Sequence, residues 1–335
     1  MTTTDTSYAV AAYDLVKTYP KNVTALDGLS VTVDAGQIFG LLGPNGAGKT
    51  TAVKILTTLA RPDSGTAVVA GHDVARHPRR VRTAIGAVAQ RSSADPVATG
   101  RDNLALQGRL YGMGGTALRR RIDELLERFA LVDAADRRVR TYSGGMQRRL
   151  EVALGLVHRP AVLFLDEPTT GLDPEARAAM WDEITQLAGD EGLTIVLTTH
   201  YLEEADRLAD RLAIIDAGRV MATGTPAELK GELYGDAVHI DLRTALDEAA
   251  ATAARTALAA VPGVREVALD GSRLSARADD GAAVVPGALA ALEGAGVAVA
   301  AVTAARPSLD DVYLRYAGRR FADADADLVT AGGES

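Results

Sequence analysis

Short apolar runs alternate with stretches of helical apolar spacing along the first 230 residues. A short, continuous apolar run bounded by polar or glycine-rich positions predicts a buried β-strand. Five runs of this kind are Gln37–Leu42, Arg82–Gln90, Ala161–Leu165, Thr194–Thr198 and Arg211–Ile215. Because helical stretches separate these strands, the pattern favours an α/β domain built on a parallel sheet.

The pattern changes near residues 231–236, and the sequence that follows is rich in alanine. Its order of elements is strand, helix, strand, strand, helix, strand, which suits a small ferredoxin-like α+β unit. The expected elements are a strand at Ala237–Leu242, a helix at Thr244–Leu258, strands at Val264–Leu269 and Leu274–Ala278, a helix at Gly287–Gly294 and a strand at Val297–Val302.

The length of 335 residues suits two domains. We expect a first domain at residues 1–232 with a helical subdomain at about 95–157, and a second domain at 236–316. The second would be an accessory or dimerisation domain. The last stretch, 317–335, is polar and rich in small residues, which predicts a disordered tail.

Composition excludes several classes of protein. The net charge is −8, whereas a nucleic-acid-binding domain is usually basic, so we expect no nucleic-acid partner. There are no cysteines, which excludes disulfides, thiolate zinc sites and a cysteine nucleophile. The N-terminus lacks the basic and apolar regions of a secretory signal, which favours the cytoplasm. The segment 282–302 is mostly alanine with Pro286 and Glu293, so we expect a helix and a strand rather than a membrane span.

The strongest chemical signal is a glycine-rich loop that follows the Gln37–Leu42 strand and opens a helix expected at Thr51–Leu59. Backbone N–H groups of such a loop, together with the helix N-terminus, form a nest for phosphate. Lys49 would reach the β- and γ-phosphates, and the Thr50 hydroxyl would bind Mg²⁺. The cofactor-binding residues expected here are Gly43, Pro44, Asn45, Gly46, Ala47, Gly48, Lys49, Thr50 and Thr51.

A second signal is the apolar run Val162–Leu165, which ends in Asp166 and Glu167. At the carboxyl end of a parallel strand, Asp166 can hold Mg²⁺ and Glu167 can polarise an attacking water. Taken alone, this pattern could equally be a strand followed by a solvated acidic turn. Together with the phosphate loop it favours a nucleoside triphosphatase, because that activity needs both parts.

A third signal is Tyr142–Gln147, in which Ser143, Gly144 and Gly145 precede a helical run. Ser143 is a good N-cap, and the two glycines let a ligand approach the helix end. This pattern suggests a second phosphate site, although in isolation such a motif is more often a simple cap.

The order of these motifs over about residues 8–230 resembles the nucleotide-binding subunit of ATP-binding cassette (ABC) transporters. Tyr142–Gln147 is similar to the cassette signature, usually written LSGGQ, with Tyr142 in place of leucine and Met146 in place of glutamine. The resemblance implies an α/β P-loop NTPase of ABC type, with a mixed sheet core and a helical subdomain, followed by the ferredoxin-like domain.

The resemblance also implies roles for residues that the spacing alone leaves open. Tyr19 would stack on adenine, although it could instead be a core tyrosine. Gln90, at the end of its strand, would contact Mg²⁺ and the attacking water. Asp173 would lie in the loop that crosses a dimer interface, and His200 would contact the γ-phosphate. The implied catalytic residues are Lys49, Glu167 and His200, and the implied Mg²⁺ ligands are Thr50, Gln90 and Asp166.

In this family, two cassettes close head-to-tail over two ATP molecules. Each ATP lies between the phosphate loop of one subunit and the signature helix of the other. The chain carries one cassette, so the resemblance implies pairing with a second cassette, most simply as a homodimer. It also implies docking on a multi-span membrane permease, at the cytoplasmic face of the membrane.

The segment Arg306–Leu314 resembles the PSLEDVFL ending of drug-exporter ATPases of the daunorubicin-resistance type. Its simpler interpretation is a helix start, with Ser308 as the N-cap, and both interpretations can hold together. The resemblance therefore favours the ATPase of a drug or antibiotic exporter. An exporter of an endogenous lipid, glycan or metabolite is the alternative. A soluble ABC protein of DNA repair or translation is less favoured, because the chain has one cassette without a long insertion and is acidic.

Overall fold

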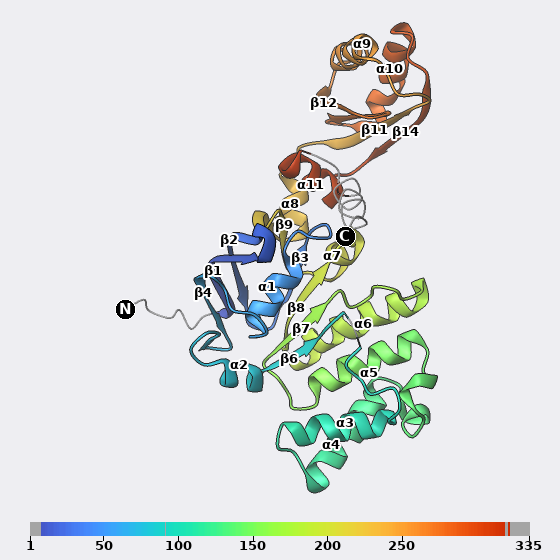
Figure 1. Ribbon diagram of the computed structural model, residues 1–335. Coiled ribbons are helices and arrows are strands. Elements are labelled where there is room, and N and C mark those ends of the chain that lie inside the picture. The colour runs from blue at the N-terminus through green and yellow to red at the C-terminus, as the bar shows by residue number, and fades with distance from the viewer. Residues whose placement is uncertain (1–7, 91, 319–320, 322–335) are drawn as a thin grey trace. The chain divides into compact units, whose positions relative to one another are not determined.

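The computed structural model describes residues 8–90, 92–318 and 321 (Figure 1). The chain divides into two compact units: the first comprises the described residues up to Pro226 together with Phe321, and the second begins at Ala227. Each unit has its own hydrophobic core. Among the described residues, no helix is both long and apolar enough to cross a lipid bilayer.

One sheet of the first unit has six strands in the order β10-β9-β3-β8-β7-β6. Its neighbouring strands are parallel, except for the antiparallel pair β9–β10. The carboxyl ends of the parallel strands therefore share one edge, from which the loops of the candidate site leave. The strands are β3 (Ile38–Leu42), β6 (Ile85–Val88), β7 (Val162–Asp166), β8 (Thr194–Thr199), β9 (Arg211–Asp216) and β10 (Arg219–Gly224).

The predicted strand Arg82–Gln90 is wrong at both ends. Residues 82–84 belong to helix α2 (Pro78–Ala84), which begins with a proline at its first turn, where the missing N–H costs nothing. Strand β6 spans only Ile85–Val88, so Gln90 lies in the following loop and does not end the strand. The helix after the phosphate loop, α1, is Lys49–Leu56 and thus begins earlier and ends sooner than predicted.

A second, antiparallel sheet of the first unit was not among the predicted strands. Its order is β2-β1-β4-β5, formed by β1 (Tyr8–Tyr19), β2 (Val23–Asp34), β4 (Ser64–Val69) and β5 (His72–Asp73). Buried and exposed positions mix along these strands, so they lack the continuous apolar runs of the parallel sheet. Their buried side chains share one core with α1 and the parallel sheet. Val10 and Leu29 of the antiparallel sheet, Phe39 of β3 and Ile55 of α1 belong to this core.

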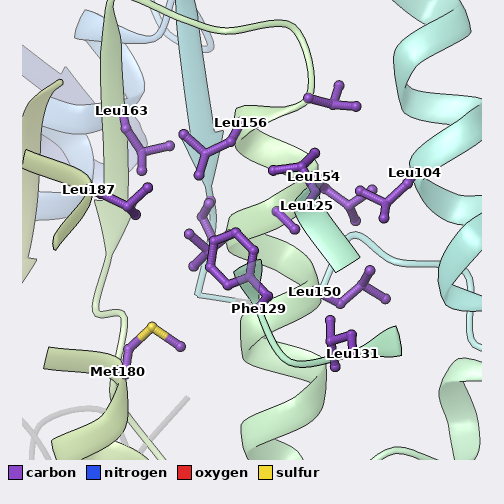
Figure 2. Close-up of a cluster of buried hydrophobic side chains, with 14 of the residues drawn as sticks. Leu104, Leu125, Phe129, Leu131, Leu150, Leu154, Leu156, Leu163, Met180 and Leu187 are labelled. Carbon is purple, nitrogen blue, oxygen red and sulfur yellow. The ribbon is translucent and has the colours of Figure 1, made fainter. Parts of the chain in front are cut away.

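A second core joins the helical subdomain to the parallel sheet (Figure 2). Phe129 lies in its centre, with Leu125 and Leu150 from two helices and Leu163 from β7 around it. Helix α3 is held at its start by Thr99, whose side chain and that of Asp102 form a capping box. The helices packed around this core are α3 (Gly100–Leu110), α4 (Gly115–Arg128), α5 (Gly144–Leu156), α6 (Pro174–Glu191) and α7 (Leu202–Leu208).

The second unit has the predicted order of elements and an antiparallel sheet, β12-β13-β11-β14, which is the ferredoxin-like arrangement. Helices α9 and α10 pack on one face through residues such as Leu258, Leu274 and Leu292. The elements are α8 (Pro226–Gly231), which enters the unit, β11 (Asp236–Leu242), α9 (Glu248–Ala259), β12 (Val264–Asp270), β13 (Arg273–Ala278), α10 (Gly281–Gly294), β14 (Val299–Ala305) and α11 (Leu309–Ala317).

Aspartate caps explain where the helices of this unit differ from prediction. Helix α9 begins at Glu248 rather than Thr244, because Asp247 accepts a hydrogen bond from Ala250 N. Helix α10 begins six residues earlier than predicted, because Asp280 caps it, and it continues through Pro286. The predicted tail at 317–335 lies outside the described residues, apart from the end of α11, Gly318 and residue 321.

Candidate active site

The phosphate loop connects β3 to α1 and depends on glycine at two positions. A Cβ on Gly43 would lie 2.3 Å from the carbonyl oxygen of Ile215. A Cβ on Gly48 would lie 2.4 Å from the carbonyl oxygen of Ala25, and Gly48 has a φ of 105°. Any side chain at either position would displace backbone. The loop is therefore a tightly packed cradle that leads into the N-terminus of α1, the geometry of an anion site.

Lys49 is buried beneath this loop, with 4 % of its surface exposed. Its ammonium donates hydrogen bonds to the carbonyl oxygens of Gly43 (2.6 Å) and Pro44 (3.0 Å). The same ammonium lies 3.8 Å from Glu167 Oε1. The cation is thus fixed between the loop and the acidic end of β7, where it can meet the phosphates of a nucleotide.

Asp166, the last residue of β7, accepts two hydroxyl hydrogen bonds on Oδ1. Thr198 of β8 donates at 2.6 Å and Thr50 of α1 donates at 3.3 Å. A carboxylate and a threonine hydroxyl are hard oxygen donors of the kind Mg²⁺ prefers, and Mg²⁺ usually takes only one or two protein carboxylates. No group of three or more histidine, cysteine, aspartate or glutamate side chains that could hold a metal ion occurs in the part of the chain that the structure describes.

Glu167 is the centre of the site. Gln90 Nε2 donates to its Oε2 at 3.0 Å, and Thr170 Oγ1 donates to the same oxygen at 3.2 Å. His200 Nδ1 lies 3.2 Å from Oε1, on the side that also faces Lys49. Residues predicted from four separate motifs therefore meet at one carboxylate, although more than 150 positions separate the first from the last.

The electrostatic surroundings keep Glu167 ionised. Burial by itself would raise the pKa of this carboxyl group, but His200, Lys49 and the Thr170 hydroxyl together lower it below its ordinary value. The backbone of Glu167 is left-handed, with a φ of 48°, and its N–H donates to Thr198. A non-glycine residue in this conformation is strained, which is common where a side chain must be aimed at a reaction centre.

The signature segment lies outside this group. Ser143 is the N-cap of α5 and accepts a hydrogen bond from Met146 N at 3.3 Å. Ser143 and Gly144 are exposed. A Cβ on Gly145 would lie 3.2 Å from the Cβ of Ala176 in α6, so the small residue permits close packing of these helices. The helix end is therefore well formed and open to solvent.

The departure of Tyr142 from the usual leucine is accommodated within the chain. Its side chain is buried, and its hydroxyl donates to the carbonyl oxygen of Ala134 at 2.6 Å. A Cβ on Gly100 would lie 2.4 Å from the tyrosine hydroxyl oxygen, so glycine there makes room for the larger ring. The other departure, Met146, packs against the core of the helical subdomain.

Two further predicted residues also lie outside the group around Glu167. Tyr19, at the end of β1, is half-buried and is not part of the core, and its ring centre lies 5.7 Å from Lys17 Nζ. Asp173 caps α6 and accepts a hydrogen bond from Ala176 N at 2.8 Å.

Arg148 is a residue that sequence reasoning missed. It is buried in α5, and its guanidinium pairs with Glu151 at 2.8 Å. It also donates to four backbone carbonyl oxygens, those of Ala89, Asp166, Glu167 and Pro168. It thus ties the signature helix to the loop before Gln90 and to the end of β7. The spacing of Arg148 and Glu151 on an otherwise apolar helix face was the available signal.

Comparison with known proteins agrees with this geometry. The ABC transporter family matches residues 26–170, and the DrrA1-3-like C-terminal domain of ATP-binding proteins matches residues 224–317. The daunorubicin resistance ATP-binding protein DrrA3 of Streptomyces coeruleorubidus is 50% identical over 88% of this chain and 91% of its own length. The Nod factor export ATP-binding protein I of Ralstonia nicotianae is 41% identical over 90% of this chain and 91% of its own length.

A solved structure extends the comparison. A dimeric ATP-binding cassette in a post-hydrolysis state, bound to ADP and phosphate, has a TM-score of 0.60 and is 25% identical, covering 64% of this chain and 98% of that one. The chain belongs to the ABC transporter family, as an ATP-hydrolysing subunit of the daunorubicin-resistance type. This confirms the family and the ATPase activity that the sequence predicted.

Proposed function

We propose that this chain hydrolyses ATP to drive export of a drug or antibiotic through a separate membrane subunit. The observation that supports this most is similarity over both units of the chain to a daunorubicin resistance ATP-binding protein. The second unit distinguishes this group from a bare cassette, and its match over residues 224–317 links the chain to the drug-resistance proteins.

The proposed chemistry assigns one task to each residue around Glu167. The ionised Glu167 carboxylate accepts a proton from the water that attacks the γ-phosphate, and Gln90 and His200 orient that water and the phosphate. Lys49 and the backbone of the phosphate loop stabilise negative charge on the β- and γ-phosphates. Thr50, Asp166 and Gln90 would hold Mg²⁺, which when bound neutralises charge on those phosphates.

A second cassette completes this proposed site. The signature residues Ser143 and Gly144 are exposed and lie outside the charged group of their own chain, which suits a role against nucleotide held by a partner. The related cassette of known structure is dimeric. We therefore propose a homodimer in which Asp173 faces the interface and Tyr19 stacks on adenine.

A groove lined by residues of α2 and of the end of α3 is the proposed docking site of the membrane subunit. It has a volume of about 500 Å³ and is lined by Arg79, Arg82, Gln107, Leu110 and Tyr111. Leu110 is 73 % exposed, so a partner docked there would cover apolar surface. An amphipathic segment with acidic side chains would fit this surface. Docking there would hold the chain at the cytoplasmic face of the membrane.

The test is drug accumulation in cells that express this chain with the membrane protein encoded beside it. Accumulation of a panel of cytotoxic antibiotics should fall, and the fall should disappear with Glu167→Gln. If no antibiotic is affected while ATPase activity is intact, the substrate is not a drug.

The second candidate is export of an endogenous lipid, glycan or metabolite. It is favoured by the similarity to a Nod factor export protein, which also spans most of the chain. Comparing the metabolites released by cells with the native chain and with Glu167→Gln would identify such a substrate.

A further inference from the structure

Glu204 is a fully buried carboxylate that the proposed chemistry does not use. It lies in α7, and none of its surface is exposed. Its Oε1 accepts hydrogen bonds from Thr169 Oγ1 at 2.7 Å and from Trp181 Nε1 at 3.0 Å, and its Oε2 has no hydrogen-bond partner among the described residues. Burying a carboxyl group with an unused acceptor is costly, so its presence calls for a specific role.

The three hydrogen-bonded residues come from two of the segments that leave the catalytic edge, the one after β7 and the one after β8. Thr169 lies between Glu167 and Thr170, in the turn after β7. Glu204 is in the first turn of α7, the helix that follows His200. Trp181 is in α6, the helix that Asp173 caps. One carboxylate oxygen therefore joins the turn after β7 to the helices that follow His200 and Asp173.

These contacts close a ring around the general base. On one side, Thr170 Oγ1 donates to Glu167 Oε2, and Thr170 follows Thr169 directly. On the other side, His200 Nδ1 lies 3.2 Å from Glu167 Oε1, and α7 begins two residues later. Glu204 connects the two sides, so a shift of α7 would move both Thr170 and His200 relative to Glu167.

Exposed contacts between α6 and α7 are less able to serve this purpose. Arg207 pairs with Asp182 at 3.1 Å, but both side chains are more than half exposed and water can replace such a pair. Water has no access to the carboxylate of Glu204, so its two hydrogen bonds must be kept or lost as a unit.

We propose that Glu204 is a positioning residue for ATP hydrolysis, which fixes α7 against the turn after β7 so that His200 and Thr170 hold Glu167 from opposite sides. Because its side chain is fully buried and bonded to Thr169 and Trp181, it would act through these groups. The proposal rests on the roles proposed above for Glu167 and His200.

The test compares steady-state ATPase activity of the full-length chain with that of three variants. Glu204→Leu removes the acceptor and should lower kcat about 10- to 100-fold with little change in KM for ATP, because the reacting groups are misplaced while the phosphate loop is untouched. Glu204→Gln keeps an acceptor oxygen and should restore most of kcat. Glu203→Leu makes the same change one residue earlier, at an exposed position, and should behave as the unsubstituted chain.

The only tryptophan of the chain reports on the same network. ATP should change the fluorescence of Trp181 in the unsubstituted chain and in Glu204→Gln, and this change should be lost in Glu204→Leu. If Glu204→Leu does not fold, Thr169→Val removes one donor to the same oxygen and should lower kcat in the same direction, again at unchanged KM.

Several results would overturn the proposal. The first is a native kcat in Glu204→Leu. The second is a loss of kcat in that variant that is fully explained by a smaller folded, nucleotide-binding fraction. The third is a kcat in Glu204→Gln that is as low as in Glu204→Leu. If Glu204→Leu does not fold, a native kcat in Thr169→Val would overturn the proposal instead. A separate measurement on Glu167→Gln tests the proposed function: native turnover there would refute the role of Glu167 whatever Glu204 does.

Discussion

The two ends of the proposed nucleotide site differ in how much of their surroundings the chain itself supplies. At the carboxyl edge of the parallel sheet, Lys49, Gln90 and His200 converge on Glu167 within one unit. At the signature end, Ser143 is capped and exposed, and it lies outside that group. Charged side chains must be brought together and shielded from water before they can act on a nucleotide, whereas a helix N-terminus can bind an anion without further residues of its own chain. The two ends therefore suit two different halves of one nucleotide site.

Removing the cation from the first end should have the largest effect. Lys49→Ala leaves the loop without its ammonium, and tight nucleotide binding should be abolished. Equilibrium binding of ATP by the full-length chain measures this directly. An unchanged affinity would mean that the loop does not hold the phosphates.

Removing the carboxylate should separate binding from turnover. Glu167→Gln keeps the shape and neutralises the base, so ATP should still bind while kcat falls about 100- to 10,000-fold. Size-exclusion chromatography with ATP should show a persistent dimer. Hydrolysis at the native rate would contradict the assignment of Glu167 as base.

A mixing experiment tests whether the phosphate loop and the signature segment of one nucleotide site come from different chains. Ser143→Ala should lower turnover but leave ATP binding by the isolated chain intact. A mixture of Ser143→Ala and Lys49→Ala chains can form one intact site, from the loop of the first and the signature of the second. The mixture should therefore be more active than either variant alone. No recovery at any mixing ratio would argue against the paired arrangement.

Breaking the link between the two ends should reduce stability. Arg148→Met leaves Glu151 and four carbonyl oxygens without their buried donor, which should lower the free energy of unfolding by about 3–5 kcal/mol. The double variant with Glu151→Leu should recover part of this loss, because no unpaired carboxylate remains. Arg120→Met, at an exposed position of α4, is the matched control. Urea denaturation of each variant measures these free energies of unfolding, which should be lowest for Arg148→Met, higher for the double variant and highest for Arg120→Met.

The smallest expected effect is on the pH dependence of stability. The pKa of Glu167 is lowered in the folded chain, so the unfolded chain binds its proton first as the pH falls. Its contribution is present above the pKa of an unfolded glutamate, about 4.3, and is lost as the pH falls through the lower folded pKa. Glu167→Gln should therefore have a shallower loss of stability in this acid range. An identical slope in both proteins would show that the folded pKa is not lowered.

The sequence predicted those features that have a local pattern. The central strands are continuous apolar runs, and the phosphate loop has fixed spacing, so both could be located. Strands β1 and β2 were not found, because each is partly exposed and carries polar residues such as Asp14 and Asp27 among apolar ones. Gln90 was predicted at a strand end, but it lies in the loop after β6, from which it donates to Glu167.

Residues whose role depends on distant partners were harder to find. Arg148 contacts backbone carbonyl oxygens, which any sequence would supply, and Glu204 meets residues 35 and 23 positions away. Neither set of contacts produces a recognisable sequence pattern, because the partners become neighbours only once the strands and helices are packed. The sequence shows only that each of these charged residues lies near apolar residues in a segment predicted to be helical.

The left-handed backbone of Glu167 couples backbone strain and charge pairing in one residue. A residue with a side chain in this conformation costs about 1–2 kcal/mol relative to glycine, which accepts it freely. Glu167→Gly would relieve that strain, but it would also leave the buried Lys49 ammonium without the carboxylate that it faces. Laboratory evolution of this chain for heat resistance should therefore not converge on glycine at position 167.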